Sequence, residues 1–110
     1  MTRGLYYDRQ GNEITDTEEW TRLHGDIDYK RVAFDELPNG RTVSTVWLGV
    51  NHNFSGVGPP IIFETMVFAE PGSYRDLDEM RYATEADAIA GHAAMVALWM
   101  LDDPAVREPS

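Results

Sequence analysis

Hydrophobic and polar residues alternate along much of this chain in short segments that are typical of strands. Residues 28–37 alternate in part, residues 41–50 are rich in Val and Thr, and residues 61–68 are apolar at most positions. A further short strand is predicted at residues 79–83. β-Branched and aromatic residues in such runs favour extended structure, and residues 38–40, Pro-Asn-Gly, are a strong turn signal. Because a tight turn joins only antiparallel strands, the pattern predicts an antiparallel sheet.

Two helices are predicted, a short one near the N-terminus and a long one near the C-terminus. Thr15 and Asp16 precede a short amphipathic segment that ends at Gly25, a residue type common just after a helix. Residues 84–87 form a capping box before an apolar run, which predicts a helix over residues 85–101. Together the elements predict an α+β fold, in which an antiparallel sheet of three to five strands packs against the long C-terminal helix.

Length and composition indicate one globular domain. The chain has 110 residues, of which 43% are hydrophobic and 25% are charged, as in ordinary soluble domains. We assign residues 1–103 to this single α+β domain. Residues 104–110 are polar and contain two prolines, so we expect a frayed C-terminal tail there.

The balance of charge narrows the classes of partner. Asp and Glu number 19 against 9 Lys and Arg, so the formal net charge is -10. Binding to phosphate backbones or anionic membranes requires clustered Lys and Arg, so we expect neither direct nucleic-acid binding nor membrane association. The longest nearly apolar run, residues 88–101, is shorter than the roughly 20 residues that cross a bilayer. A cytoplasmic location is therefore expected.

No motif in the sequence carries a recognisable chemistry. There is no cysteine, and the three histidines lack the close spacing of a metal site. The glycines around residues 56–60 are not followed by the Lys and Ser/Thr of a phosphate-binding loop. We therefore assign no catalytic residue, no metal ligand and no cofactor, and we favour a protein that is not an enzyme.

Charged residues are missing from the middle of the chain. Residues 42–63 contain no Asp, Glu, Lys or Arg, and His52 is their only ionisable side chain. One interpretation is that two central strands are buried against a helix and joined by a roomy loop. The other is that this loop lines a pocket or contacts a partner through His52, Asn53 and Phe54, because such polar and aromatic groups suit recognition.

Glu64 interrupts the apolar strand at residues 61–68. Both faces of this strand are largely apolar, which predicts a central strand covered on both sides and a partly buried Glu64. A buried carboxylate needs a partner, and Arg81, His52 and His92 are the candidates. We expect either a structural ion pair or a pocket formed by these four residues that binds or hydrolyses a small molecule.

The C-terminal helix is apolar nearly all round, and such a helix is usually buried on more than one side. One sheet cannot cover the whole circumference. We therefore expect a homodimer through this helix, with Met95, Leu98 and Trp99 as its candidate interface. The alternative is that an N-terminal arm, residues 5–14, folds over the second face of the helix.

Three segments together resemble a family of small uncharacterised proteins encoded by tailed bacteriophages, many of which infect actinobacteria. These are residues 44–49 (STVWLG), residues 62–68 (IFETMVF), and residues 80–85 (MRYATE) leading to Gly91 and His92. The resemblance implies a phage or prophage origin, a place in the host cytoplasm, and roles in host takeover, defence evasion or the virion. It transfers no activity and no functional residue.

Four functions follow from these observations. The leading hypothesis is a small interaction protein that binds a host or phage protein. The second is an acidic mimic of nucleic acid that blocks a DNA-binding protein, since the N-terminal third holds a dense set of acids: Asp8, Glu13, Asp16, Glu18, Glu19, Asp26 and Asp28. The third is the small-molecule or hydrolytic pocket, and the fourth is a minor component of the virion.

Overall fold

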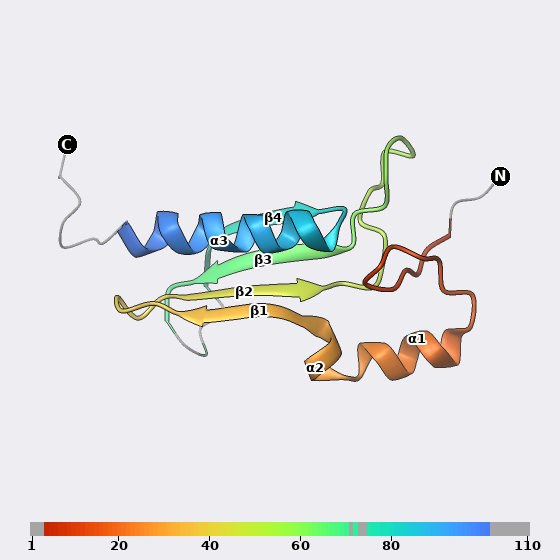
Figure 1. The fold of residues 1–110 in the computed structure, drawn as a ribbon, viewed down its shortest axis with the longest axis horizontal. Helices are drawn as coiled ribbons and strands as arrows, with labels where there is room; N and C mark the ends of the chain where they lie inside the picture. The colour runs from red at the N-terminus through yellow and green to blue at the C-terminus, as the bar shows by residue number, and fades with distance from the viewer. Residues whose placement is uncertain (1–3, 71, 73–74, 102–110) are drawn as a thin grey trace.

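A computed structural model describes residues 4–70, 72 and 75–101 of the chain. It confirms the α+β class, since a four-stranded antiparallel sheet packs against a long C-terminal helix and a short helix lies near the N-terminus (Figure 1). The elements in chain order are α1 (Thr17–His24), α2 (Ile27–Lys30), β1 (Arg31–Glu36), β2 (Thr42–Trp47), β3 (Phe63–Phe68), β4 (Asp76–Tyr82) and α3 (Glu85–Leu101). The predicted tail at residues 104–110 lies outside the described residues.

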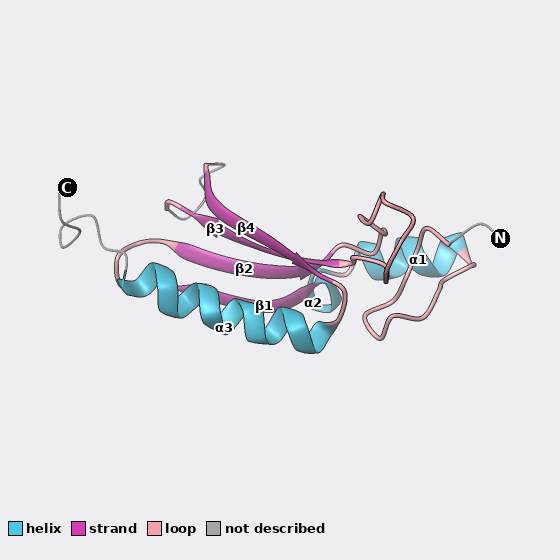
Figure 2. Cartoon of the chain, turned by 90° about the horizontal axis from the view of Figure 1, so that it is seen from above, coloured by secondary structure: helices cyan, strands magenta, loops and turns pink. Residues whose placement is uncertain are grey.

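The sheet is a simple meander in the order β1-β2-β3-β4, with every neighbouring pair antiparallel. Helix α3 runs along one face of this sheet, whereas α1 and the long loops gather beyond one end (Figure 2). The residues that face α3 alternate along the two central strands, as the period of a strand requires, and all are buried: Val43, Thr45, Trp47, Phe63, Thr65 and Val67.

The opposite face of the sheet is only half-buried, which corrects the prediction that β3 is covered on both sides. Ser44 and Val46 of β2, and Glu64 and Met66 of β3, all have intermediate exposure. The apolar residues on this face are therefore partly shielded by their cross-strand neighbours. No second layer covers them within the described residues.

Helix α3 is apolar all round, but within the described residues only one of its faces is covered. Its inner face holds Ala88, His92 and Met95, which are buried against the sheet. The exposed part of the helix combines alanines with three large apolar side chains that are about half exposed: Ile89, Leu98 and Met100. Alanine has the highest helix propensity and presents little apolar surface to water, so the alanines need no covering partner, and the homodimer through α3 stays a prediction.

The N-terminal arm packs against the end of the sheet and leaves the outer face of α3 open. Tyr6 forms an isolated antiparallel bridge with Val50, and Tyr7 forms one with Glu13. The indole Nε1–H of Trp47 donates to the Tyr7 carbonyl at 2.9 Å. The alternative in which the arm covers the second face of α3 is therefore wrong, although Arg9 does reach Glu85 at the start of the helix.

Two boundaries differ from those predicted. Residues 28–30 belong to α2, because the Asp26 carboxylate accepts a hydrogen bond from the Tyr29 amide and begins a helical turn there. Strand β4 begins at Asp76, three residues before the predicted start. The start of this strand is not predicted from the sequence because Asp and Glu are uncommon in strands, and the segment contains Asp76, Asp78 and Glu79.

Candidate functional site

The structure does not bring His52, Glu64, Arg81 and His92 together into one pocket. His92 lies on α3 and faces the sheet, where it contacts Thr45. Glu64 neighbours Thr65 in β3, so its side chain projects from the opposite face. His52 lies in the loop beyond β2, and its ring is hydrogen bonded to the Val50 carbonyl. A shared small-molecule or hydrolytic site therefore has no geometric basis here.

Glu64 instead forms the ion pair that the sequence offered as the alternative. It stands directly opposite Arg81 in β4, and the guanidinium Nε–H donates to Glu64 Oε2 at 2.9 Å. The Glu64 side chain is mostly covered, whereas the Arg81 side chain is largely open to water. A cross-strand pair of this kind stabilises the sheet by a fraction of a kcal/mol up to about 1 kcal/mol. Glu64 is therefore half of a cross-strand ion pair in this structure.

His92 is part of a hydrogen-bonded chain that links α3 to three strands. Its Nε2 lies 2.7 Å from Asp35 Oδ2 in β1, and its Nδ1 lies 2.7 Å from the Thr45 hydroxyl in β2. The Thr45 and Thr65 hydroxyls are 2.5 Å apart. Asp35, Thr45 and Thr65 were not predicted, because they lie on separate strands and share no motif.

The hydrogen bonds of this chain begin at a carboxylate. A carboxylate only accepts hydrogen bonds, so the N–H at His92 Nε2 donates to Asp35. His92 Nδ1 shares a hydrogen bond with the Thr45 hydroxyl, which in turn shares one with the Thr65 hydroxyl. No buried side-chain polar atom of the described residues is left without a partner. The order of carboxylate, imidazole and hydroxyl resembles that of a hydrolase triad. Both threonines are fully buried, so no substrate can reach them, and the chain serves to fasten α3 to the sheet.

The charge-free loop between β2 and β3 is held together by its own side chains. The Asn51 Oδ1 accepts hydrogen bonds from the Asn53 and Ile61 amides at 2.8 and 3.1 Å. The Asn53 Nδ2 donates to the carbonyls of Val57 and Pro59, each at 2.8 Å. Asparagine side chains commonly replace backbone partners in turns, and here they fix the loop at both its base and its middle.

Two apolar side chains stand at the tip of this braced loop. Phe54 is 84% exposed and Val57 is 78% exposed. The His52 ring lies 6.0 Å from the Phe54 ring between centroids, on the side of the loop base. Of the three predicted loop residues, Phe54 thus faces solvent, whereas His52 and Asn53 are partly buried. Val57 was not singled out from the sequence, although its place among glycines and prolines indicates a loop tip.

The candidate dimer residues have three different environments. Met95 is buried in the chain's own core beside Val43 and Val67. Trp99 is partly buried, and its indole Nε1–H donates to Asp78 Oδ2 at 3.1 Å. Leu98 is 56% exposed, so it alone of the three presents most of its side chain to solvent.

Most acids of the N-terminal third have a local structural role. Asp8 accepts hydrogen bonds from the amides of Gln10 and Asn12 and closes a turn. Asp16 and Asp26 are the N-caps of α1 and α2. Three others lie in the first turns of these helices, where the helix dipole favours negative charge: Glu18, Glu19 and Asp28. Helix and turn geometry accounts for the positions of these acids, and the mimicry of nucleic acid stays a prediction.

Comparison with protein families, curated proteins and solved structures found no match. Among the described helices, none has the length and apolar character needed to cross a membrane. The described residues likewise contain no group of three or more His, Asp or Glu side chains placed to hold a metal ion. The surface feature with the best defined geometry is the loop tip, where Phe54 is exposed on a loop that Asn51 and Asn53 hold in place.

Proposed function

We propose that this chain is a small interaction protein that binds another protein by inserting the tip of its 51–61 loop into an apolar pocket. The observation that carries the proposal is the 84% exposure of Phe54 on a loop braced by Asn51 and Asn53. An exposed aromatic ring on a preorganised loop loses little conformational entropy when it binds. Burial of such a ring contributes about 2–3 kcal/mol, which is the size of an interface hot spot.

The lack of charge around the tip supports a protein pocket as its target. No charged residue occurs between positions 42 and 63, so insertion of the tip desolvates no ion. The net charge of -10 repels anionic membranes, which disfavours a lipid surface as the alternative target. A host or phage protein with an apolar pocket fits both observations, as the resemblance to phage proteins also implies.

Site-specific photocrosslinking tests the proposal. Phe54 is replaced by benzoylphenylalanine, which keeps an aromatic ring at the tip, and the protein is expressed in its source cells, or in infected cells if a phage encodes it. We expect one discrete crosslinked protein. The matched control carries the same group at Ile27, which is 70% exposed on α2 and should not form this product.

Competition experiments then test the role of the loop geometry. Excess wild-type protein should abolish the Phe54 crosslink, whereas Phe54→Ser should compete poorly. Asn53→Ala keeps Phe54 but removes the hydrogen bonds to Val57 and Pro59, so it should also compete less well than wild type. Equal crosslinking from positions 54 and 27, or full competition by Phe54→Ser, would show that the loop tip is not the binding surface.

A further inference from the structure

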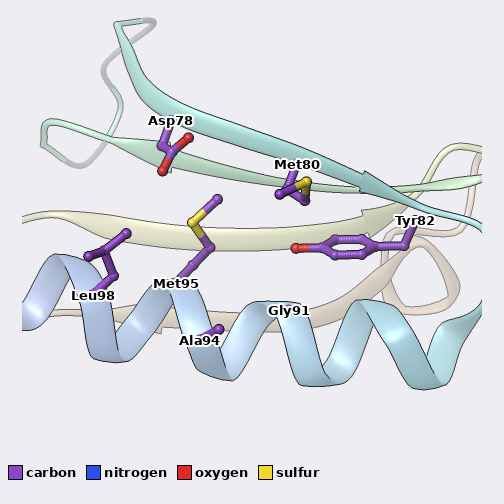
Figure 3. Close-up of a pocket in the computed structure, with 7 residues that line it drawn as sticks. All are labelled: Asp78, Met80, Tyr82, Gly91, Ala94, Met95 and Leu98. Carbon is purple, nitrogen blue, oxygen red and sulfur yellow. The ribbon is translucent and has the colours of Figure 1, made fainter.

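A second surface, separate from the loop, lies between helix α3 and strand β4. It is a groove of about 290 Å³ whose walls are almost entirely apolar. Figure 3 shows Tyr82 reaching from β4 toward the helix at Gly91, and Met95 pointing from the helix toward the sheet. Met80 on the strand and Leu98 on the helix are both more than half exposed. The groove is therefore open to solvent along apolar walls.

Strand β4 also leaves one backbone edge of the sheet open. It is the last strand in the order β1-β2-β3-β4, and within the described residues it pairs only with β3. An unpaired edge carries free amide and carbonyl groups that can accept another strand. An edge strand beside a helix and an apolar groove is the arrangement used when extended peptides add to a sheet, with backbone hydrogen bonds along the edge and alternate side chains in the groove.

The charges around the groove indicate what kind of strand it accepts. β4 carries three acids against the single cation Arg81. Asp78 lies among the groove residues, whereas Asp76 and Glu79 stand opposite Phe68 and Met66 and so share the other face of the sheet with the Arg81–Glu64 pair. The first turn of α3 has Asp87 and also Glu85, which is paired with Arg9, and the helix contains no Lys or Arg. Two such acidic edges repel each other, which disfavours pairing with a second copy of the chain. A basic strand is attracted.

We propose that the groove between α3 and β4 binds an extended segment of a partner protein, which adds to β4 as a fifth strand. The segment is apolar at alternate positions, so that every second side chain enters the groove between Met80 and Leu98. Lys or Arg at the intervening positions projects from the other face of the sheet, where Asp76 and Glu79 of β4 lie. Binding at this site is independent of Phe54 and of the loop.

A library of random dodecapeptides displayed on phage tests this proposal with the full-length protein as bait. The discriminating variant is Ala94→Phe, which fills the groove from an exposed position of α3. The matched control is Ala93→Phe, which adds the same side chain to the neighbouring exposed alanine outside the groove lining. Circular dichroism confirms that both variants keep the fold. We expect enriched peptides that alternate apolar and basic residues and that bind Ala94→Phe at least about tenfold more weakly, with Ala93→Phe unaffected.

N-methylation of the tightest selected peptide then distinguishes strand addition from other modes. A strand turns alternate amides toward its neighbour, so methyl groups on one alternate set should abolish binding and those on the other should not. The proposal is overturned if no enriched peptide loses affinity for Ala94→Phe. It is also overturned if both methylated peptides bind like the parent, because the groove then binds side chains without backbone hydrogen bonds. The same holds if both methylated peptides fail to bind and the parent peptide is helical, because the groove then binds a helix.

Discussion

His92 of α3 is hydrogen bonded through Nδ1 to the Thr45 hydroxyl of β2, with 2.7 Å between the two atoms, in a part of the core where both residues are buried. This contact is the middle of a chain that continues to Thr65 on one side and to Asp35 on the other. Because only Asp35 is exposed, with 55% of its side chain open to water, the remaining polar groups depend on one another. The core of this protein therefore contains a buried hydrogen-bonded network. Removal of one member leaves another without a partner, whereas removal of all the buried members does not.

Removal of His92 alone should destabilise the protein strongly. His92→Leu leaves the Thr45 hydroxyl buried without its imidazole partner, and such an unsatisfied group costs about 1–3 kcal/mol of the free energy of unfolding. Urea denaturation followed by far-UV circular dichroism measures the loss. Asp35→Asn is the matched mild change, since an amide oxygen can still accept from His92 near the surface, and it should cost less than about 1 kcal/mol.

Replacement of all the buried members of the hydrogen-bonded chain should recover part of the stability that His92→Leu loses. The triple variant Thr45→Val, Thr65→Val and His92→Leu has no buried polar group left without a partner, and Val has nearly the shape of Thr. Because apolar replacement of all partners is far less costly than removal of one, the triple variant should be more stable than His92→Leu alone. A triple variant that is less stable than His92→Leu would show that packing, and not the hydrogen-bonded chain, determines the stability here.

Gly91 is required by the ring of Tyr82. A Cβ atom at Gly91 would collide with the Tyr82 ring and hydroxyl (Figure 3), so Gly91→Ala should destabilise the fold even though Ala favours a helix by about 1 kcal/mol. In a Tyr82→Ala background the collision is gone, and Gly91→Ala should become neutral or stabilising. A double-mutant cycle from thermal unfolding measures this coupling. Equal effects of Gly91→Ala in both backgrounds would contradict it.

The long helix and the central strands could be predicted because local rules and tertiary packing agree there. Residues 85–101 combine a capping box with an uninterrupted apolar run, and the structure has a helix over those same residues. Strand β4 was placed too late because acids at Asp76 and Asp78 contradict strand propensity, and pairing with β3 overrides that preference. The apolar pattern of α3 predicts a helix but not which of its faces the sheet covers, because an apolar residue count does not distinguish the buried Met95 from the exposed Leu98.

The candidate site was less predictable than the fold. The loop residues His52, Asn53 and Phe54 could be found because turn-forming and aromatic residues stand together in the sequence. The pairing of Glu64 with Arg81 was among the alternatives, but only the register of β3 with β4 selects it. The chain from Asp35 to Thr65 depends on contacts across three strands and a helix, for which the sequence carries no local signal.

Gly49 should tolerate substitution much less well than Gly40, although both have positive φ angles of 76° and 88°. A Cβ at Gly49 would lie 2.8 Å from Trp20 Nε1 and 2.9 Å from the Trp47 ring, whereas nothing lies within 4 Å of a Cβ at Gly40. Gly40→Ala bears only the left-handed backbone cost of about 1–2 kcal/mol. Gly49→Ala adds overpacking of about 1–3 kcal/mol. Equal midpoints of thermal unfolding for the two variants would exclude this difference.

The stability of the protein should fall as the pH drops through the range in which His24 titrates. Burial, followed by the positive charge of Lys30, lowers the pKa of His24 from its ordinary value of 6.5. Both causes disfavour the protonated ring in the folded protein relative to the unfolded chain. The His24 ring stacks on Trp20 with 4.6 Å between centroids. Below about pH 6.5 the unfolded chain therefore binds more protons than the folded one, and the free energy of unfolding decreases with falling pH.

Two variants isolate this contribution from that of other titrating groups. His24→Phe keeps an aromatic ring beside Trp20 but cannot be protonated, so it should lose less stability than wild type between about pH 7.5 and 5.5. Lys30→Gln removes the second cause of the lowered pKa and should reduce the pH dependence to an intermediate degree. Urea denaturation at each pH gives the free energies. A lowered pKa of His24 in the folded state requires wild type to lose more stability on acidification than His24→Phe. If the two proteins lose the same stability, His24 does not cause the pH dependence.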